Sequence, residues 1–181
     1  MSVFDIYKNR PMVRDFVSIV ACVLLGAILV FSGTGKLAGL GQFPGQTEFL
    51  DRFIPDFLFT PDFAYFIGTY FIPWILPIAE LALGLLLIIG IWPRVMAILF
   101  LPLVFGFMAN NSYMIMEGLT EFPDCGCFGI WERILGAVTP LQSMYIDVGM
   151  FILAVLIIIV HPAPFFSHQF WFDRIFNRNK I

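Results

Sequence analysis

Two of the three cysteines in this chain are separated by a single glycine, in the run Cys125-Gly126-Cys127. Outward-facing cysteines can form disulfides, whereas cytosolic ones mostly cannot. A disulfide across one glycine closes a small, strained ring, and strain makes such a bond labile and oxidising. The spacing therefore indicates a pair that exchanges disulfides with other thiols. A structural thiol pair or staple in a tight turn is the alternative.

The remaining metal-binding residue types point to no metal site. A structural zinc site requires four cysteine or histidine ligands, and only Cys125 and Cys127 lie on their side of the predicted membrane. Cys22 lies near the start of the first apolar segment, where we expect a buried apolar side chain. His161 and His168 are candidates for ligating a haem or a pigment, although His161 also suits the end of a helix.

Several polar residues interrupt the apolar segments. Lys36, Asn110, Asn111 and Asp147 should all lie in the outer third of the bilayer, as one polar cluster beneath the cysteine loop. Intramembrane ionisable groups are costly and usually have a partner or a role. We predict an ion pair between Lys36 and Asp147. A structural polar network that holds helices together is the alternative reading.

Glu80 lies nearer the middle of its segment, after Pro73 and Pro77, which should bend the helix there. A buried carboxyl of this kind could carry protons or contact a quinone headgroup. The alternative is a structural acid held by a neighbour. Quinone is the candidate cofactor that this carboxyl suggests.

The chain that positions these residues is too apolar for a soluble domain. Its 181 residues are 60% hydrophobic and 13% charged, against about 25% charged in soluble domains. Four segments are long enough to cross a bilayer, which requires about 20 residues each. We place them at residues 16–37, 65–91, 95–116 and 139–160. The sequence predicts an all-α integral membrane protein, a single four-helix bundle over residues 1–181 with the lipid bilayer as a partner.

The basic residues predict the orientation, because positive charge accumulates on the cytoplasmic side. One side has Lys8, Arg10, Arg14, Arg94, Arg174, Arg178 and Lys180, and the other has only Lys36, Arg52 and Arg133. We expect an inner (cytoplasmic) membrane protein with both termini inside. The cysteine loop then faces the periplasm or the exterior. The net charge of -3 indicates no nucleic-acid partner.

Two further segments should lie on the membrane surface rather than cross it. Residues 49–66 form an aromatic outer stretch. In the cytoplasmic tail 161–181, residues 165–181 combine aromatic with basic residues and should form an interfacial amphipathic helix. Packing of the aromatic residues against the bundle or a partner is the alternative.

Short motifs in order along the chain resemble the DoxX-like membrane superfamily, and within it the MauE-type (methylamine utilisation) branch. The run FSGTGKL at 31–37 is similar to a Ser-Gly-x-x-Lys-Leu signature, and LPIAELALG at 76–84 is similar to a Glu-and-Gly pattern. The cysteine loop, the run TPLQ at 139–142 and Asp147 are similar to the MauE-type third and fourth helices. The resemblance covers about residues 16–160.

This resemblance implies a four-helix bundle and a role in thiol–disulfide chemistry, such as forming disulfides in an exported thiol protein. Known quinone-linked membrane proteins of that kind use a second cysteine pair, which this chain lacks. We therefore carry two hypotheses. One is a thiol–disulfide redox protein or redox-coupled maturation helper that uses Cys125 and Cys127. The other is a non-catalytic subunit of a larger respiratory or photosynthetic membrane complex, suggested by the 22 phenylalanines.

Overall fold

The computed structural model describes residues 11–38, 60–118, 129–131, 136 and 138–161. Its elements are helices throughout: α2 (Pro11–Ala38), α4 (Pro61–Phe66), the π-helix η1 (Ile67–Ile75), α5 (Leu76–Ile89), α6 (Pro93–Met116) and α8 (Pro140–Val160). The π-helix runs directly into α5, so η1 and α5 form one continuous rod.

Four helical segments are long and apolar enough to cross a membrane, with η1 and α5 counted as one. They comprise Arg14–Ala38, Ile67–Ile89, Pro93–Met116 and Pro140–Val160. The predicted all-α membrane protein with four spanning helices is therefore confirmed. Of the predicted surface segments, the structure describes only residues 60–66, where α4 exposes Phe63, Tyr65 and Phe66. Residues 49–59 and the tail beyond His161 lie outside the described residues.

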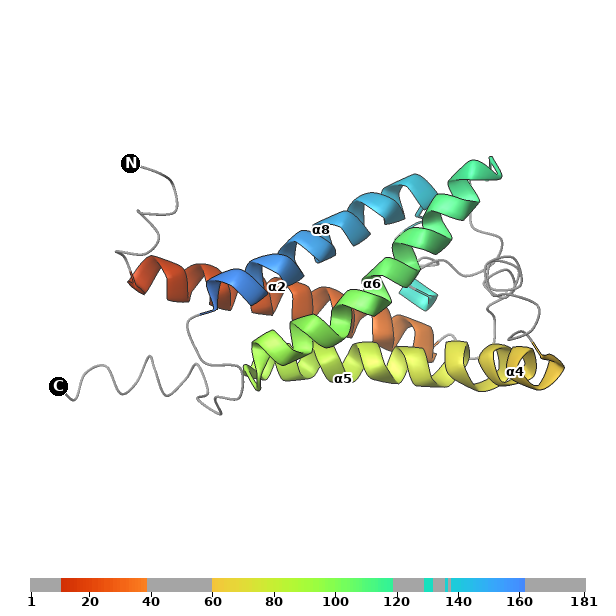
Figure 1. Cartoon of the computed structure of the whole chain (residues 1–181), viewed down its shortest axis with the longest axis horizontal. Coiled ribbons are helices and arrows are strands. Elements are labelled where there is room, and N and C mark those ends of the chain that lie inside the picture. Colours follow the sequence, from red (N-terminus) through yellow and green to blue (C-terminus); the bar gives the residue numbers. More distant parts are fainter. Residues whose placement is uncertain (1–10, 39–59, 119–128, 132–135, 137, 162–181) are drawn as a thin grey trace.

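The helices associate mainly in two pairs, α2 with α5 and α6 with α8 (Figure 1). Glycines allow the first pair to come very close. A Cβ atom added at Gly26 would lie 2.7 Å from the Gly84 carbonyl oxygen, and one added at Gly33 would lie 2.8 Å from the Pro77 carbonyl oxygen. Small residues at a crossing are the usual basis of close packing between membrane helices. The tight α2–α5 contact also determines which polar side chains of these helices meet.

A core of buried side chains joins the two pairs. It contains Leu25 and Leu29 from α2, Leu87 from α5, Phe100 from α6 and Ile157 from α8, all fully or almost fully buried. The many exposed apolar side chains point away from this core, as expected for helices surrounded by lipid.

The widened turns of η1 surround Pro73, which lacks the N–H that an α-helix would use. The Leu76 N–H instead bonds to the carbonyl of Phe71, five residues earlier. The bend that the prolines predict is thus a π-helix, a feature often found at functional sites. It places Ile67, Phe71 and Ile72 along the cavity described below.

The α5–α6 turn and the start of α8 have clear local causes. Gly90, with φ of 83°, ends α5 in the left-handed conformation that glycine adopts most easily. Trp92 and Pro93 then start α6. At the start of α8, the Thr139 hydroxyl accepts a hydrogen bond from the Gln142 N–H, and the Gln142 side chain accepts one from the Thr139 N–H. This reciprocal cap fixes where α8 begins.

The start of α2, the α5–α6 turn and the end of α8 lie at one end of the bundle, which we call the His161 end (Figure 1). His161 Nδ1 lies 2.7 Å from the Ser18 hydroxyl oxygen, and Arg94 donates to the His161 carbonyl. These two hydrogen bonds connect α2, α6 and the end of α8. We call the opposite end the Lys36 end.

Candidate functional site

Lys36 is buried near the C-terminal end of α2 and pairs with Glu80 of α5. The Lys36 Nζ–Glu80 Oε1 distance is 2.5 Å, and the two side chains are 4% and 0% exposed. The Ser32 hydroxyl, one helical turn before Lys36, donates to the second carboxylate oxygen at 2.9 Å. Lys36 Nζ also lies 4.7 Å from the centre of the Phe107 ring of α6, a cation–π geometry. Both oxygens of Glu80 are thus satisfied.

This pair corrects the predicted partner of Lys36. We expected Asp147, but the carboxylate that meets Lys36 is Glu80, because α2 packs most closely on α5 across the glycines. The sequence signal is the spacing of Ser32 and Lys36, which places both on one face of α2. That spacing indicates a shared acceptor on the neighbouring helix, but it does not say which helix is the neighbour.

Asp147 lies in a second polar group, between α6 and α8. Asn111 Nδ2 donates to Asp147 Oδ2 at 2.6 Å and to Ser143 Oγ at 3.0 Å. Asn111 is 0% exposed, Ser143 1% and Asp147 2%. Ser143 was not among the predicted site residues, although its spacing of four from Asp147 puts both on one face of α8.

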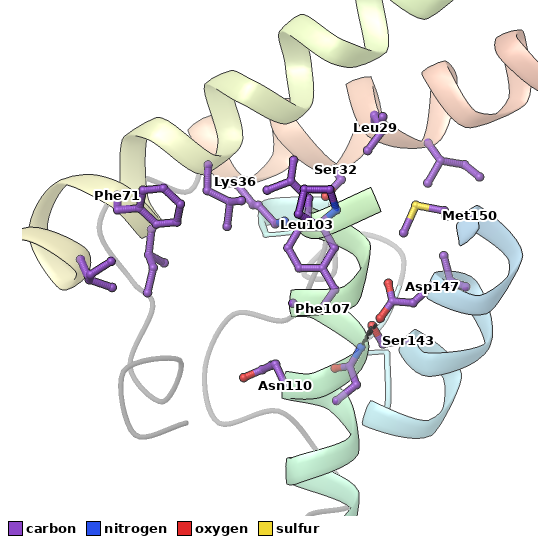
Figure 2. Close-up of a pocket in the computed structure, with 18 residues that line it drawn as sticks. Leu29, Ser32, Lys36, Phe71, Leu103, Phe107, Asn110, Ser143, Asp147 and Met150 are labelled. Carbon is purple, nitrogen blue, oxygen red and sulfur yellow. Dashed lines mark hydrogen bonds between the residues drawn. The ribbon is translucent and has the colours of Figure 1, made fainter. Parts of the chain in front are cut away.

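A cavity of about 340 Å³ separates these two polar groups. Figure 2 shows Lys36 and Ser32 on one side of it and Ser143 and Asp147 on another, with Phe107 between them. All the spanning helices contribute to its lining, which consists of Ile28, Leu29, Ser32, Lys36, Ile67, Phe71, Ile72, Leu76, Pro102, Leu103, Gly106, Phe107, Asn110, Asn111, Ser143, Ile146, Asp147 and Met150. The lining is apolar except for a few convergent polar groups, which is the usual character of a ligand site.

Two cavity-lining residues each have a buried side-chain oxygen, Asn110 Oδ1 and Asn111 Oδ1, with no hydrogen-bond partner in the part of the chain that the structure describes. Both residues are on the α6 wall, and Asn110 is labelled there in Figure 2. A buried acceptor without a partner costs about 1–3 kcal/mol.

The segment that follows the cysteine pair contacts the Lys36 end of α2. Gly129 has φ of 57°, and a Cβ atom there would lie 2.4 Å from the Gly35 carbonyl oxygen and 2.7 Å from the Lys36 nitrogen. Trp131 stacks on Phe31 with ring centres 5.1 Å apart, and its indole N–H donates to the Phe31 carbonyl at 3.1 Å. These contacts fix residues 129–131 against the helix that carries Lys36.

The other predicted site residues divide into three cases. Cys125 and Cys127 lie outside the described residues, as does His168. Cys22 is 5% exposed, in the core between the helices. His161 is held by Ser18 and Arg94 at the opposite end from the cavity. The structure thus joins Lys36 with Glu80 and Asn111 with Asp147. Lys36, Asn110, Asn111 and Asp147 line one cavity, whereas Glu80 is buried behind Lys36 and does not line it.

Taken together, the fold and this site define a multi-pass membrane protein whose buried polar residues surround one cavity. The family model described as methylamine utilisation protein MauE matches residues 14–160, which is most of the chain. The chain belongs to the MauE family. Neither the curated proteins nor the solved structures contain a match to it.

Proposed function

We propose that this MauE-family protein is a membrane thiol–disulfide redox protein, or a redox-coupled maturation helper, that acts on an exported thiol protein through Cys125 and Cys127. The observation that supports this function is the contact of Gly129 with Gly35 and Lys36. Cys127 precedes Gly129 by only two residues in the sequence. The cysteine pair is therefore followed directly by a segment that contacts the Lys36 end.

The proposed reaction is a disulfide exchange. A thiolate of the partner attacks one sulfur of the Cys125–Cys127 disulfide, and the other cysteine leaves as a thiolate. The second partner thiol then attacks the mixed disulfide, so that the partner disulfide forms and the Cys125–Cys127 dithiol is released. The partner loses two electrons and two protons, and the cysteine pair gains them.

The side of the membrane follows from the charges. We propose the inner membrane with both termini in the cytoplasm, so that the Lys36 end and the cysteine loop face outward. Arg14 and Arg94 lie toward the His161 end of the bundle, in agreement with the positive-inside rule. An outward loop has access to exported thiols and to an environment in which disulfides persist.

Trapping the exchange intermediate tests this function. Replacing Cys127 by Ser should leave Cys125 in a mixed disulfide with its partner, or Cys125→Ser should do so on Cys127. Non-reducing gels of membranes treated with an alkylating agent would show the adduct, which disappears on reduction. Cys22→Ser is the control, because Cys22 is buried in the core and should trap nothing.

If neither single variant traps a partner and the double variant supports normal growth and assembly, the redox function is wrong. The protein would then be a non-catalytic subunit, with the cysteine pair shaping a loop. The exposed aromatic residues do not favour that alternative by themselves, because lipid would cover them equally well.

A further inference from the structure

We propose that the cavity between Lys36 and Asp147 binds a primary ammonium group carried on an apolar body, with the ammonium donating to the Asp147 carboxylate. This ligand site uses no residue of the cysteine loop, so it extends beyond the proposed redox function. It follows from one carboxylate oxygen, from the charges around the cavity and from the place where the cavity opens.

Asp147 presents one oxygen of its carboxylate to the cavity without a hydrogen bond. The residue is 2% exposed and lines the cavity. Its Oδ2 accepts from Asn111 at 2.6 Å, whereas no described residue donates to its Oδ1. Figure 2 shows this second oxygen directed away from Asn111, into the space between Leu29 and Met150, and it is not closed off as the Asn111 Oδ1 is. An ionised carboxylate only accepts hydrogen bonds, so the ligand must supply a donor.

The charges around the cavity leave Asp147 without a counter-ion. The Lys36 ammonium and the Glu80 carboxylate are 2.5 Å apart and neutralise each other. Lys36 attracts the Asp147 carboxylate and Glu80 repels it, so the pair acts on Asp147 with opposite signs. A buried carboxylate that has no counter-ion is costly and takes up either a proton or a cation. A ligand with one positive charge therefore balances the site, whereas an anionic ligand would add a second negative charge.

The rest of the lining fits an apolar body attached to the ammonium. Leu103 and Met150 lie at the cavity with the ring of Phe107, and Phe71 of η1 supplies a second aromatic ring (Figure 2). Aromatic faces attract cations as well as apolar groups. The volume of about 340 Å³ lies within the range of roughly 300–1,000 Å³ that is usual for small-molecule sites.

The position of the opening indicates how the ligand arrives. Pro102 and Gly106 line the cavity and are also exposed, and both lie well inside the spanning helix α6. The cavity therefore reaches the lateral surface of the bundle, where the membrane places acyl chains rather than water. An uncharged amine with an apolar body dissolves in lipid. Transfer of a proton from the Asp147 carboxyl to the amine nitrogen then forms the ammonium–carboxylate pair inside the cavity.

Binding measurements on the purified full chain test this site. The probes are 4-phenylbutylamine, 4-phenylbutanol and 4-phenylbutanoate, which share one apolar body and differ in the terminal group. Calorimetry at neutral pH in phosphatidylcholine nanodiscs, corrected with empty nanodiscs, should show the amine binding at least about tenfold more tightly than the alcohol. The reason is that a charge-assisted hydrogen bond is roughly twice as strong as a neutral one. The carboxylate probe should bind more weakly than either.

A change of lipid distinguishes the two sources of such an ammonium group. Phosphatidylethanolamine carries a primary ammonium in its headgroup, whereas the phosphatidylcholine headgroup has no N–H donor. If phosphatidylethanolamine in the nanodisc competes with 4-phenylbutylamine, the ligand is a lipid headgroup. If it does not compete, the ligand is a free amine.

Two matched variants locate the site. Asp147→Asn keeps the shape of the side chain but removes its charge, so amine binding should fall at least about tenfold, to the level of the alcohol. Asp62→Asn removes an exposed carboxylate of α4 that does not line the cavity, so amine binding should not change. Thermal unfolding of each variant shows whether it is folded.

Binding of the alcohol or the carboxylate as tight as that of the amine would overturn the assignment, as would undiminished amine binding in a folded Asp147→Asn protein. If Asp147→Asn does not fold, the comparison of the three probes on the unchanged protein still decides. The double Cys125→Ser, Cys127→Ser variant should bind the amine as the unchanged protein does. Failure of the cysteine chemistry therefore leaves this binding intact, and failure of the binding leaves the trapped mixed disulfide intact.

Discussion

The Lys36 ammonium and the Glu80 carboxylate have almost no contact with solvent, so each depends on the other for its charge to be tolerated. Removal of one partner from a buried pair leaves an uncompensated charge, which is more damaging than removal of both. Ser32 and Phe107 add a hydrogen bond and a cation–π contact to this pair.

Lys36→Met or Glu80→Leu alone should therefore destabilise the protein by about 3 kcal/mol, and the double variant should cost clearly less than the total of the two. Thermal unfolding in detergent, followed by circular dichroism, would give the double-mutant cycle. Lys36→Met combined with Asp62→Asn, an exposed residue of α4, is the control and should be additive. If the losses of stability from Lys36→Met and Glu80→Leu simply add in the double variant, the two side chains do not form a pair.

Gly129 carries a second prediction at this scale. Ala at this position must both adopt a φ of 57° and displace the Gly35 carbonyl, so Gly129→Ala should loosen the segment after the cysteines. Gly118→Ala has a similar backbone requirement, with φ of 75°, but no atom within 4 Å. Limited proteolysis measures the difference, and cleavage of the loop should rise more in Gly129→Ala than in Gly118→Ala. An equal rise in both variants would show that the contact with α2 does not hold this segment.

At the scale of elements, the sequence predicts the spanning helices well and their neighbours poorly. Length and hydropathy identify each span, because a bilayer tolerates only long apolar helices with internally satisfied backbones. Which helices lie side by side depends on surface shape, here on Gly26, Gly33 and Gly84, whose role needs three-dimensional packing to be recognised. That is why Asp147 was expected as the partner of Lys36 and Glu80 was found.

The glycine contact between α2 and α5 can be tested directly. A Cβ atom at Gly84 would lie 2.8 Å from the Gly26 carbonyl oxygen, so Gly84→Ala should separate the helices and cost about 1–3 kcal/mol. Gly149→Ala on α8 meets no atom within 4 Å and should be neutral or slightly stabilising. The melting temperatures of the two variants in the same detergent check this difference, and equal values would show that the crossing tolerates a methyl group.

For the molecule as a whole, the sequence identifies the polar residues of the membrane segments but not how they are grouped. Lys36, Glu80, Asn110, Asn111 and Asp147 each stand out as polar residues in apolar segments. The cavity that separates them could not be predicted from the sequence. Its volume depends on the angles between the helices and on the widened turn at Pro73. The burial of the Asn110 and Asn111 side-chain oxygens, which have no partner among the described residues, is likewise a property of the packed structure.

The orientation of the whole bundle is a prediction that intact cells can test. With both termini inside, a membrane-impermeant thiol reagent should label Cys125 and Cys127 after mild reduction, while Cys22 stays unlabelled in the folded protein because it is 5% exposed. Mass spectrometry of the labelled peptides distinguishes the sites. Labelling that requires permeabilised cells would reverse the proposed topology.

The pairing of polar side chains also has a consequence for biogenesis. Lys36 leaves the ribosome 44 residues before Glu80, and Asn111 leaves 36 residues before Asp147. At about 5–20 residues per second, Lys36 waits roughly 2–9 s for its counter-ion. An unpaired ammonium is costly in lipid, so α2 should remain at the insertion machinery until α5 has been made. The ion pair thus sets an order of assembly, in which the two helix pairs enter the bilayer as successive hairpins.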